Sequence, residues 1–308
     1  MKLKDIKAEY KNNAISKTEY IEKMHKLHEV LFEYAEFLKE TDISKIEIEK
    51  DNIIMTTRKS NIRILCDKDD LRIIPIEILN FGSYEENELE MILKFVKANT
   101  NVFDIGGNIG WISLNISRHF PSANIYTFEP IPKTFEYLKK NVELNNFSNI
   151  HINNFGFSNE EKDIVFYYYA EGSGNASMTN LSENANVVKT ICSVKRLDDY
   201  VFSNNLEVDF IKCDVEGAEL FVFQGGLEVL KKHKPLVFTE MLRKWAIKFN
   251  YHPNQIIRMF NEIGYKCFTI KQNSLKEILT MDDDTLETNF FFLHQVKHAD
   301  IINEYMIE

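Results

Sequence analysis

Cysteine, positive charge and long apolar runs are all scarce in this chain of 308 residues. The four cysteines lie far apart and none belongs to a Cys-x-x-Cys pair, so neither a zinc site nor a disulfide framework is indicated. No apolar run approaches the roughly 20 residues that span a bilayer, and residues 1–5 lack the apolar core of a secretory signal. We therefore expect a cytoplasmic protein with no membrane span.

Basic residues number 37 against 47 acidic ones, which gives a net charge of −10. Nucleic-acid binding draws much of its affinity from Lys and Arg on phosphates, so this balance argues against nucleic acid as a partner. The clearest basic run, residues 231–234, falls where a helix is predicted to end, and cations there favour the helix dipole. We expect a small-molecule partner instead.

Residues 1–80 are predicted to form an extension ahead of the main domain, residues 81–308. Within the extension, apolar residues recur in steps of four and three, which is a heptad seam on a helix; they are Tyr20, Met24, Leu27, Leu31, Tyr34 and Leu38. Such a helix either docks on its own domain or forms a homodimer, since a short isolated helix needs a packing partner. Four β-rich runs follow at 46–48, 53–57, 62–66 and 71–75, which predict an antiparallel meander.

Beyond this extension, strand and helix patterns alternate, which predicts an α/β fold with a doubly wound, parallel sheet. Strands are expected at 102–105, 124–129, 150–154, 208–213, 236–240, 265–270 and 289–295. Helices are expected at 85–98, 109–120, 132–145, 218–231 and 253–263. Residues 162–194 interrupt the alternation with two β-like runs around a loop rich in Gly, Ser and Asn. Residues 172–177 of this loop are a candidate lid.

The most informative stretch is residues 101–111, Asn-Val-Phe-Asp-Ile-Gly-Gly-Asn-Ile-Gly-Trp. A strand leads to Asp104, three glycines open a loop and a helix follows, so backbone N–H groups and a helix N-terminus lie beside a ligand. An acid ahead of the first glycine is awkward for pyrophosphate but suits a cationic amino group. The spacing also departs from the G-x-G-x-x-G of dinucleotide sites. These features favour S-adenosylmethionine over a nicotinamide dinucleotide.

Ligands of an open α/β sheet bind at the carboxyl ends of the strands, and the first three core strands each end in a suitable group. The first brings Asp104 and the glycine loop, and the second brings Glu129 for two ribose hydroxyls. The third ends at residues 154–156, where a backbone N–H and an apolar face would hold adenine. The predicted cofactor-binding residues are Asp104, Gly106, Gly107, Asn108, Gly110, Trp111, Glu129, Pro130, Asn154, Phe155, Gly156 and Asp214.

Between about residues 81 and 293 the sequence resembles the FkbM family of S-adenosylmethionine-dependent methyltransferases. The matching stretches are Gly-Ser-Tyr-Glu at 82–85, the glycine loop at 104–110, Phe-Glu-Pro at 128–130, Leu-Asp-Asp-Tyr at 197–200 and the block 209–219. The last block, with its Asp-Val-Glu-Gly core, is the most specific. Gly107 and Gly156 stand where the family usually has alanine, which removes no functional group.

The resemblance implies a Rossmann-like class I methyltransferase fold, with a mostly parallel seven-stranded sheet whose last strand is antiparallel. It also implies methyl transfer to oxygen, commonly to a hydroxyl of a sugar or a natural product. The leading hypothesis is therefore an O-methyltransferase of a carbohydrate, such as a nucleotide-activated sugar or a surface-glycan intermediate. The alternatives are a lipid-linked or polyketide-like acceptor, the ribose of RNA, and a scaffold that no longer transfers methyl groups.

The tips of the fourth and fifth strands carry the candidate catalytic residues Lys212, Asp214, Glu216 and Glu240. Lys212 and Asp214 lie two apart on a strand and share a face, so they form either a structural ion pair or a general base, Asp214, that Lys212 positions. The three acids are also a ligand set for Mg²⁺, although we favour a site without a metal. Residues 243–245, Arg-Lys-Trp, either receive a diphosphate or begin a solvated helix.

Overall fold

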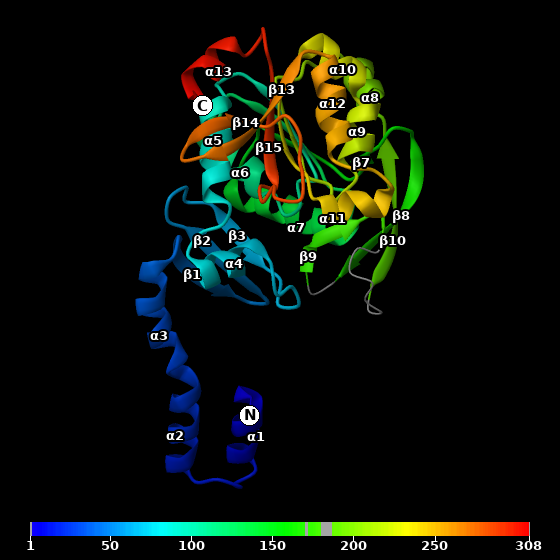
Figure 1. The fold of residues 1–308 in the computed structure, drawn as a ribbon. Helices are drawn as coiled ribbons and strands as arrows, with labels where there is room; N and C mark the ends of the chain where they lie inside the picture. The colour runs from blue at the N-terminus through cyan, green and yellow to red at the C-terminus, as the bar shows by residue number, and fades with distance from the viewer. Residues whose placement is uncertain (1, 170–171, 180–186, 308) are drawn as a thin grey trace.

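The fold is built around a nine-stranded, mostly parallel sheet (Figure 1). The computed structural model describes residues 2–169, 172–179 and 187–307. Seven core strands lie in the order β6 (Ile150–Asn153), β5 (Asn124–Phe128), β4 (Asn101–Ile105), β11 (Phe210–Cys213), β12 (Leu236–Glu240), β15 (Asn289–His294) and β13 (Tyr265–Lys271). β15 runs antiparallel to both of its neighbours, whereas β6 to β12 are parallel. The predicted class I methyltransferase fold, with its antiparallel last strand, is confirmed.

Two further strands, β14 (Ser274–Glu277) and β16 (Met306–Ile307), extend the sheet beyond β13. The prediction of seven strands was therefore wrong by two. β14 contains a single apolar residue, Leu275, and β16 is only two residues long. Neither carries the alternating apolar pattern from which a strand is recognised.

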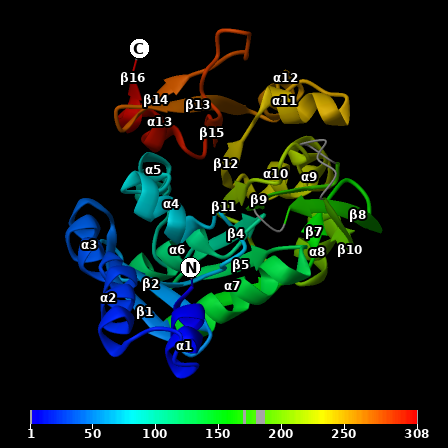
Figure 2. The same cartoon turned by 90° about the horizontal axis from the view of Figure 1, so that it is seen from below.

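Side chains along the core strands alternate between two hydrophobic cores, one on each face of the sheet. On β4, Val102 belongs to one core, and Phe103 and Ile105 belong to the other. The first face is covered by α5 (Glu86–Phe95), α6 (Trp111–His119) and α7 (Pro132–Asn145) (Figure 2). The second face is covered by α8 (Leu197–Ser203), α9 (Glu219–Gly225), α10 (Leu227–His233) and α12 (Asn254–Glu262). The single helix predicted over 218–231 is divided at Gly226 into α9 and α10.

A second sheet is inserted after β6 and has the order β7 (Gly156–Phe157), β10 (Val188–Lys195), β8 (Lys162–Tyr169), β9 (Gly172–Ser177). β10 pairs in parallel with β7, so this sheet is attached to the chain just after the tip of β6. The prediction of a lid loop over 172–177 was wrong, because these residues form an edge strand that pairs with β8.

The N-terminal extension begins with α1 (Leu3–Lys11), α2 (Lys17–His28) and α3 (Val30–Phe37), which project from the body as an arm (Figure 1). The predicted meander is confirmed as β1 (Ile43–Glu49), β2 (Asn52–Thr57) and β3 (Arg63–Cys66). Its fourth strand, expected at 71–75, was wrong, because α4 (Ile74–Phe81) begins there. Pro75 lies in the first turn of α4, where a missing N–H costs nothing.

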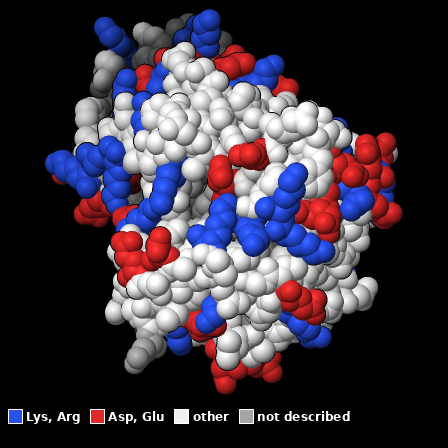
Figure 3. Space-filling view, turned by 90° about the horizontal axis from the view of Figure 1, so that it is seen from above, with Lys and Arg blue, Asp and Glu red and all other residues white. Residues whose placement is uncertain are grey.

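Two short helices, α11 (Arg243–Ala246) and α13 (Ala299–Tyr305), complete the fold. No helix among the described residues is long and apolar enough to cross a membrane. Seen from the end that carries α10 and α13, Lys and Arg side chains gather near the middle of the surface, and Asp and Glu side chains flank them (Figure 3). The charges of this surface are therefore mixed in sign.

Candidate active site

The glycine loop between β4 and α6 forms the floor of the site, and backbone contacts hold it in place. The N–H groups of Gly106 and Gly107 both donate to the Phe128 carbonyl at the tip of β5, at 3.0 and 2.9 Å. Gly106 has a φ of +75°, and a Cβ there would lie 1.8 Å from the backbone oxygen of Asp214. Only glycine allows the loops after β4 and β11 to approach this closely.

Glu129 stands at the tip of β5 and is almost fully buried. Its Oε2 accepts from the backbone N–H of Asn108 at 3.0 Å, and its Oε1 accepts from that of Ile131 at 2.8 Å. Burial raises the pKa of Glu129 to about 7, although the two N–H groups oppose the shift. The carboxylate is fixed in direction, and each oxygen keeps a lone pair for a further donor.

The tip of β6 differs from what the sequence predicts. Asn154 is exposed, and its Nδ2 donates to the backbone carbonyls of residues 129 and 130, so it braces the loop after β5. The ring of Phe155 packs among other aromatic rings, with Lys195 Nζ 4.4 Å from its centroid. It is Phe157, on β7, that lines the pocket beside the glycine loop.

Lys212 is the buried cation at the centre of the site. It lies beside Asp104 in the register of β11 and β4, with its Nζ 3.5 Å from Asp104 Oδ1 and 3.5 Å from Asp214 Oδ2. Nζ also donates to the carbonyl of Gly106 at 2.6 Å. Burial by itself lowers the pKa of Lys212, but the carboxylates of Asp214, Asp104 and Glu85 outweigh it, and the pKa is raised. Lys212 is therefore a permanent positive charge that fixes two carboxylates.

Asp104 is fully buried rather than open to the pocket. Its Oδ2 accepts from the hydroxyl of Ser113 at 2.5 Å, and among the described residues its Oδ1 has only the ion-pair contact with Lys212. The sequence reasoning has Asp104 bind a cationic amino group directly. In the structure Asp104 is not among the residues that line the pocket, and its carboxylate is paired with Lys212 instead.

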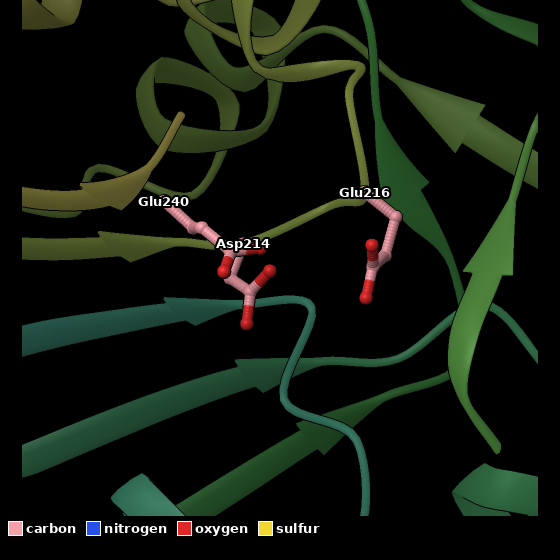
Figure 4. A group of neighbouring side chains, drawn as sticks. All are labelled: Asp214, Glu216 and Glu240. Atoms are coloured by element: carbon pink, nitrogen blue, oxygen red, sulfur yellow. The ribbon is translucent and has the colours of Figure 1, made fainter. Parts of the chain in front are cut away.

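Asp214, Glu216 and Glu240 meet at the carboxyl ends of β11 and β12 (Figure 4). One carboxylate oxygen from each lies within 4.8 Å of the others. Burial, followed by the charge of Asp214, raises the pKa of Glu240 to about 9. The same two causes, with Glu240 in addition, raise the pKa of Glu216 well above its usual range. Both shifts favour the protonated form, so the cluster carries less negative charge than three free carboxylates would.

The loop that carries Asp214 and Glu216 is held by Glu219, a residue that sequence reasoning missed. Glu219 Oε1 accepts from the N–H groups of Val215 and Gly217 at 3.1 and 3.0 Å. Its Oε2 accepts from the Tyr251 hydroxyl at 3.2 Å. Glu219 ends the conspicuous block 209–219, so its position in that block was a usable signal.

One pocket joins these elements, and residues from six segments line it. The lining residues are Ile105, Gly106, Asn108, Glu129, Pro130, Ile131, Gly156, Phe157, Phe166, Met178, Asp214, Val215, Glu216 and Ala218. Six of the predicted cofactor-binding residues are among them: Gly106, Asn108, Glu129, Pro130, Gly156 and Asp214. The inserted sheet adds Phe166 from β8, and Met178 follows β9 directly.

Two other sequence candidates lie elsewhere. Trp111 packs edge-on against Tyr84, with ring centroids 6.2 Å apart, in the core under α6. Arg243 donates to the side chain of Asp283 and to the carbonyl of Thr285, at 3.3 and 3.2 Å. Its guanidinium therefore anchors a neighbouring loop, which disfavours the role of diphosphate receptor.

Comparison with known proteins is consistent with this geometry. The family model described as the methyltransferase FkbM domain matches residues 104–267, more than half of the chain. Methyltransferase 1 of Beauveria bassiana is 32% identical over 142 residues, which are 40% of this chain and 57% of that protein. The hexuronic acid methyltransferase AglP of Haloferax volcanii is 29% identical over 151 residues, 48% of this chain and 58% of that protein.

A crystal structure of methyltransferase FkbM from Methylobacillus flagellatus KT is 15% identical, with a TM-score of 0.42, and the match covers 64% of this chain and 44% of that one. The chain spans little more than half the length of the two relatives named above, 57% and 58%. The family model is matched through both the glycine loop and the Asp214 block. This chain belongs to the FkbM methyltransferase family.

Proposed function

We propose that this protein is an S-adenosylmethionine-dependent O-methyltransferase whose acceptor is a hydroxyl of a carbohydrate. Membership of a methyltransferase family supports the reaction class. The position of the pocket supports the cofactor, because it lies at the carboxyl ends of β4, β5 and β11, where an open α/β sheet binds its ligands.

Glu129 is the observation on which the cofactor assignment rests. Its two oxygens are fixed by N–H groups from two different loops, at 3.0 and 2.8 Å, and the carboxylate lines the pocket. Such a carboxylate is prepared to accept both hydroxyls of a ribose. Beside it, the buried Oδ1 of Asn108 has no partner among the described residues, and Gly106 places no side chain in the way. These groups fit an adenosyl ligand.

The acceptor side is supplied by Asp214, Lys212 and the neighbouring glutamates Glu216 and Glu240. S-adenosylmethionine, when bound, supplies an electrophilic methyl group. Asp214 lines the pocket and its Oδ2 is held 3.5 Å from Lys212 Nζ, so it is oriented to take the proton of an acceptor hydroxyl. General-base help of this kind is worth about 10²–10⁴ in rate, and positioning contributes roughly 7–11 kcal/mol.

A hydroxyl-rich acceptor suits the side chains that converge here. The raised pKa values of Glu216 and Glu240 favour their protonated forms, and a protonated carboxyl offers a hydroxyl donor as well as an acceptor oxygen. One relative's name states a hexuronic acid as its substrate, and that of another, from Sinorhizobium fredii, states 2-O-methyl transfer; the latter is 28% identical over 159 residues, 47% of this chain and 64% of that protein. Together these points favour a sugar.

We further propose that the reaction needs no metal ion, because Lys212 Nζ already places a positive charge 3.5 Å from Asp214 Oδ2. Turnover is then unchanged by EDTA. Loss of turnover with EDTA and its recovery with Mg²⁺ or Mn²⁺ would contradict this.

We propose a cytoplasmic location because the four cysteines are all free thiols.

Calorimetry with S-adenosylhomocysteine tests the cofactor assignment. We expect micromolar binding to the wild-type chain and little or none to Glu129→Ala. Glu136→Ala is the matched control, because Glu136 is an exposed glutamate on α7 outside the pocket. If Glu129→Ala binds as tightly as the control, the proposed cofactor site is wrong.

A panel of sugars, nucleotide sugars and lipid-linked sugars then identifies the acceptor. Turnover of each compound is measured by the formation of S-adenosylhomocysteine.

A further inference from the structure

The donor pocket has an apolar wall that the sequence motifs do not supply. Ile131 and Phe157 line it after β5 and on β7, and Phe166 and Met178 come from the inserted sheet and its connection. Phe166 is buried in a small core that also contains Ile131, and Met178 packs against that core. Ile131 is two residues beyond Glu129 and donates to its carboxylate. The apolar wall therefore begins where the ribose would end.

When Glu129 binds the ribose hydroxyls of a nucleoside, only the ribose ring separates the base from that carboxylate. A purine has two flat, apolar faces and needs a wall of aromatic or polarisable side chains against them. We propose that the inserted sheet is the purine-binding wall of this enzyme, with Phe166 and Met178 against the adenine of the donor. This inference rests on the proposed function, since it assigns a place to the base of the same cofactor.

The wall is part of the folded body rather than a separate cover. β10 pairs with β7 through Val194 and Gly156, and Phe157 is the next residue on β7. At the other end, the buried hydroxyl of Ser177 on β9 donates to the carbonyl of Glu216 at 2.9 Å. The segment that faces the base is thus hydrogen-bonded to the loop that carries the acceptor-side acids. Ser177 is a positioning residue for that loop.

The apolar wall takes the place of the adenine contact that was predicted at the tip of β6. Phe155 has its ring among other aromatic rings and under Lys195 Nζ, so it is already occupied. Asn154 is engaged with the loop after β5. The purine contact therefore passes to residues that lie outside the conspicuous motifs.

Binding of S-adenosylhomocysteine and of 5′-methylthioadenosine to three variants tests the wall. Phe166→Leu removes the aromatic face but keeps a large apolar side chain in the core, and Met178→Ala removes a half-buried side chain. We expect each variant to lower the affinity for both ligands by the same factor. For Phe166→Leu, which loses the aromatic stack, this factor is about 5- to 150-fold. Equal factors are expected because both ligands carry the purine.

Val165→Ala is the matched control, because Val165 is the neighbour of Phe166 on β8 and is 39% exposed on the opposite face. Its affinity for both ligands stays within twofold of the wild-type value. Thermal melting checks that each variant is folded. If Phe166→Leu and Met178→Ala, both folded, bind like Val165→Ala, the wall is wrong although the cofactor assignment stands. If the wild-type chain itself binds neither ligand, the proposed function fails instead.

Discussion

Asp214 and Glu240 are neighbouring acids with different expected roles, and their amide variants separate them. Asp214→Asn removes the proton acceptor and is expected to lower kcat by about 10²–10⁴. Glu240→Gln is expected to leave kcat at pH 7 within about threefold, because a carboxyl with a pKa of about 9 is already neutral there and the amide reproduces its shape. Initial rates with the best sugar of the panel measure both. Equal losses in the two variants would contradict the assignment.

Glu129 gives the binding of the donor a pH dependence. Its pKa is raised to about 7, so the fraction in the carboxylate form falls as the pH drops below 7. Ribose hydroxyls need the carboxylate, so the Kd for S-adenosylhomocysteine is expected to rise about tenfold per pH unit below that point and to be flat above it. Calorimetry from pH 5.5 to 8.5 measures this. The same slope in Glu129→Gln would assign the effect to another group.

At the level of single residues, the sequence could predict groups that lie in a strand-to-loop pattern. Gly106, Glu129 and Asp214 each follow a recognisable apolar strand, and the structure brings all three to one pocket. Phe157 was missed in favour of Phe155 because a shift of two residues after a strand decides which ring faces the ligand. Phe166 and Met178 were missed because only pairing of the inserted sheet with β7 brings them to the pocket.

Among the elements, α3 is the one whose surroundings do not satisfy it. Six of its eight residues, in Val-Leu-Phe-Glu-Tyr-Ala-Glu-Phe, are apolar or aromatic, and none is buried. A helix that is apolar on all sides is normally covered. The heptad seam shows which face is left uncovered. Its residues on α2, Tyr20, Met24 and Leu27, are half-buried, whereas Leu31 and Tyr34 continue the seam on α3 and are exposed to solvent.

We propose that a second copy of the chain covers α3. The arm carries both lysines and glutamates, such as Lys26, Glu29 and Glu33, which suits pairing with itself rather than with a partner strongly charged in one sign. Light scattering after gel filtration is expected to give a dimer, and Leu31→Lys with Phe32→Lys a monomer. Ile48→Lys, which places the same charge on an exposed residue of β1, is the control. A wild-type monomer at micromolar concentration would contradict the proposal.

Element boundaries show what periodicity could and could not supply. α7 was predicted with both ends correct, because Pro132 marks its start and Asn146, in a left-handed conformation, ends it. The run Ile73–Leu79 resembles a strand in composition but forms α4, since Pro75 is compatible with the first turn of a helix. Strands β9, β14 and β16 carry almost no alternating apolar pattern, so sheet pairing alone defines them.

On the scale of the whole molecule, the meander and the main domain share one hydrophobic core. Ile43, Met55 and Ile64 of the meander belong to the same cluster as Leu138 and Val142 of α7. The predicted division at residue 80 passes through this shared core. Contacts between segments so far apart in the chain leave no trace in local periodicity, which is why the sequence could not show them.

Asn141 on α7 is the polar residue that locks these parts together, and it is fully buried. Its Oδ1 accepts from the N–H of Leu65 on β3, and its Nδ2 donates to the carbonyl of Ile109 in the glycine loop, both at 2.9 Å. Asn141→Ala leaves two buried backbone groups without partners, at about 1–3 kcal/mol of unfolding free energy for each. The glycine loop loses a support in the same step, so the affinity for S-adenosylhomocysteine is expected to fall as well.

Urea unfolding, followed by circular dichroism and by tryptophan fluorescence, measures this loss. Trp111 lies in the shared core and reports on it directly, so the two probes are expected to give coincident curves for the wild-type chain and for Asn141→Ala. Asn87→Ala, at an exposed position of α5, is the control and changes stability by at most about 0.5 kcal/mol. Two separate transitions would show that the meander unfolds on its own, and the shared core would then not bind the two parts into one cooperative unit.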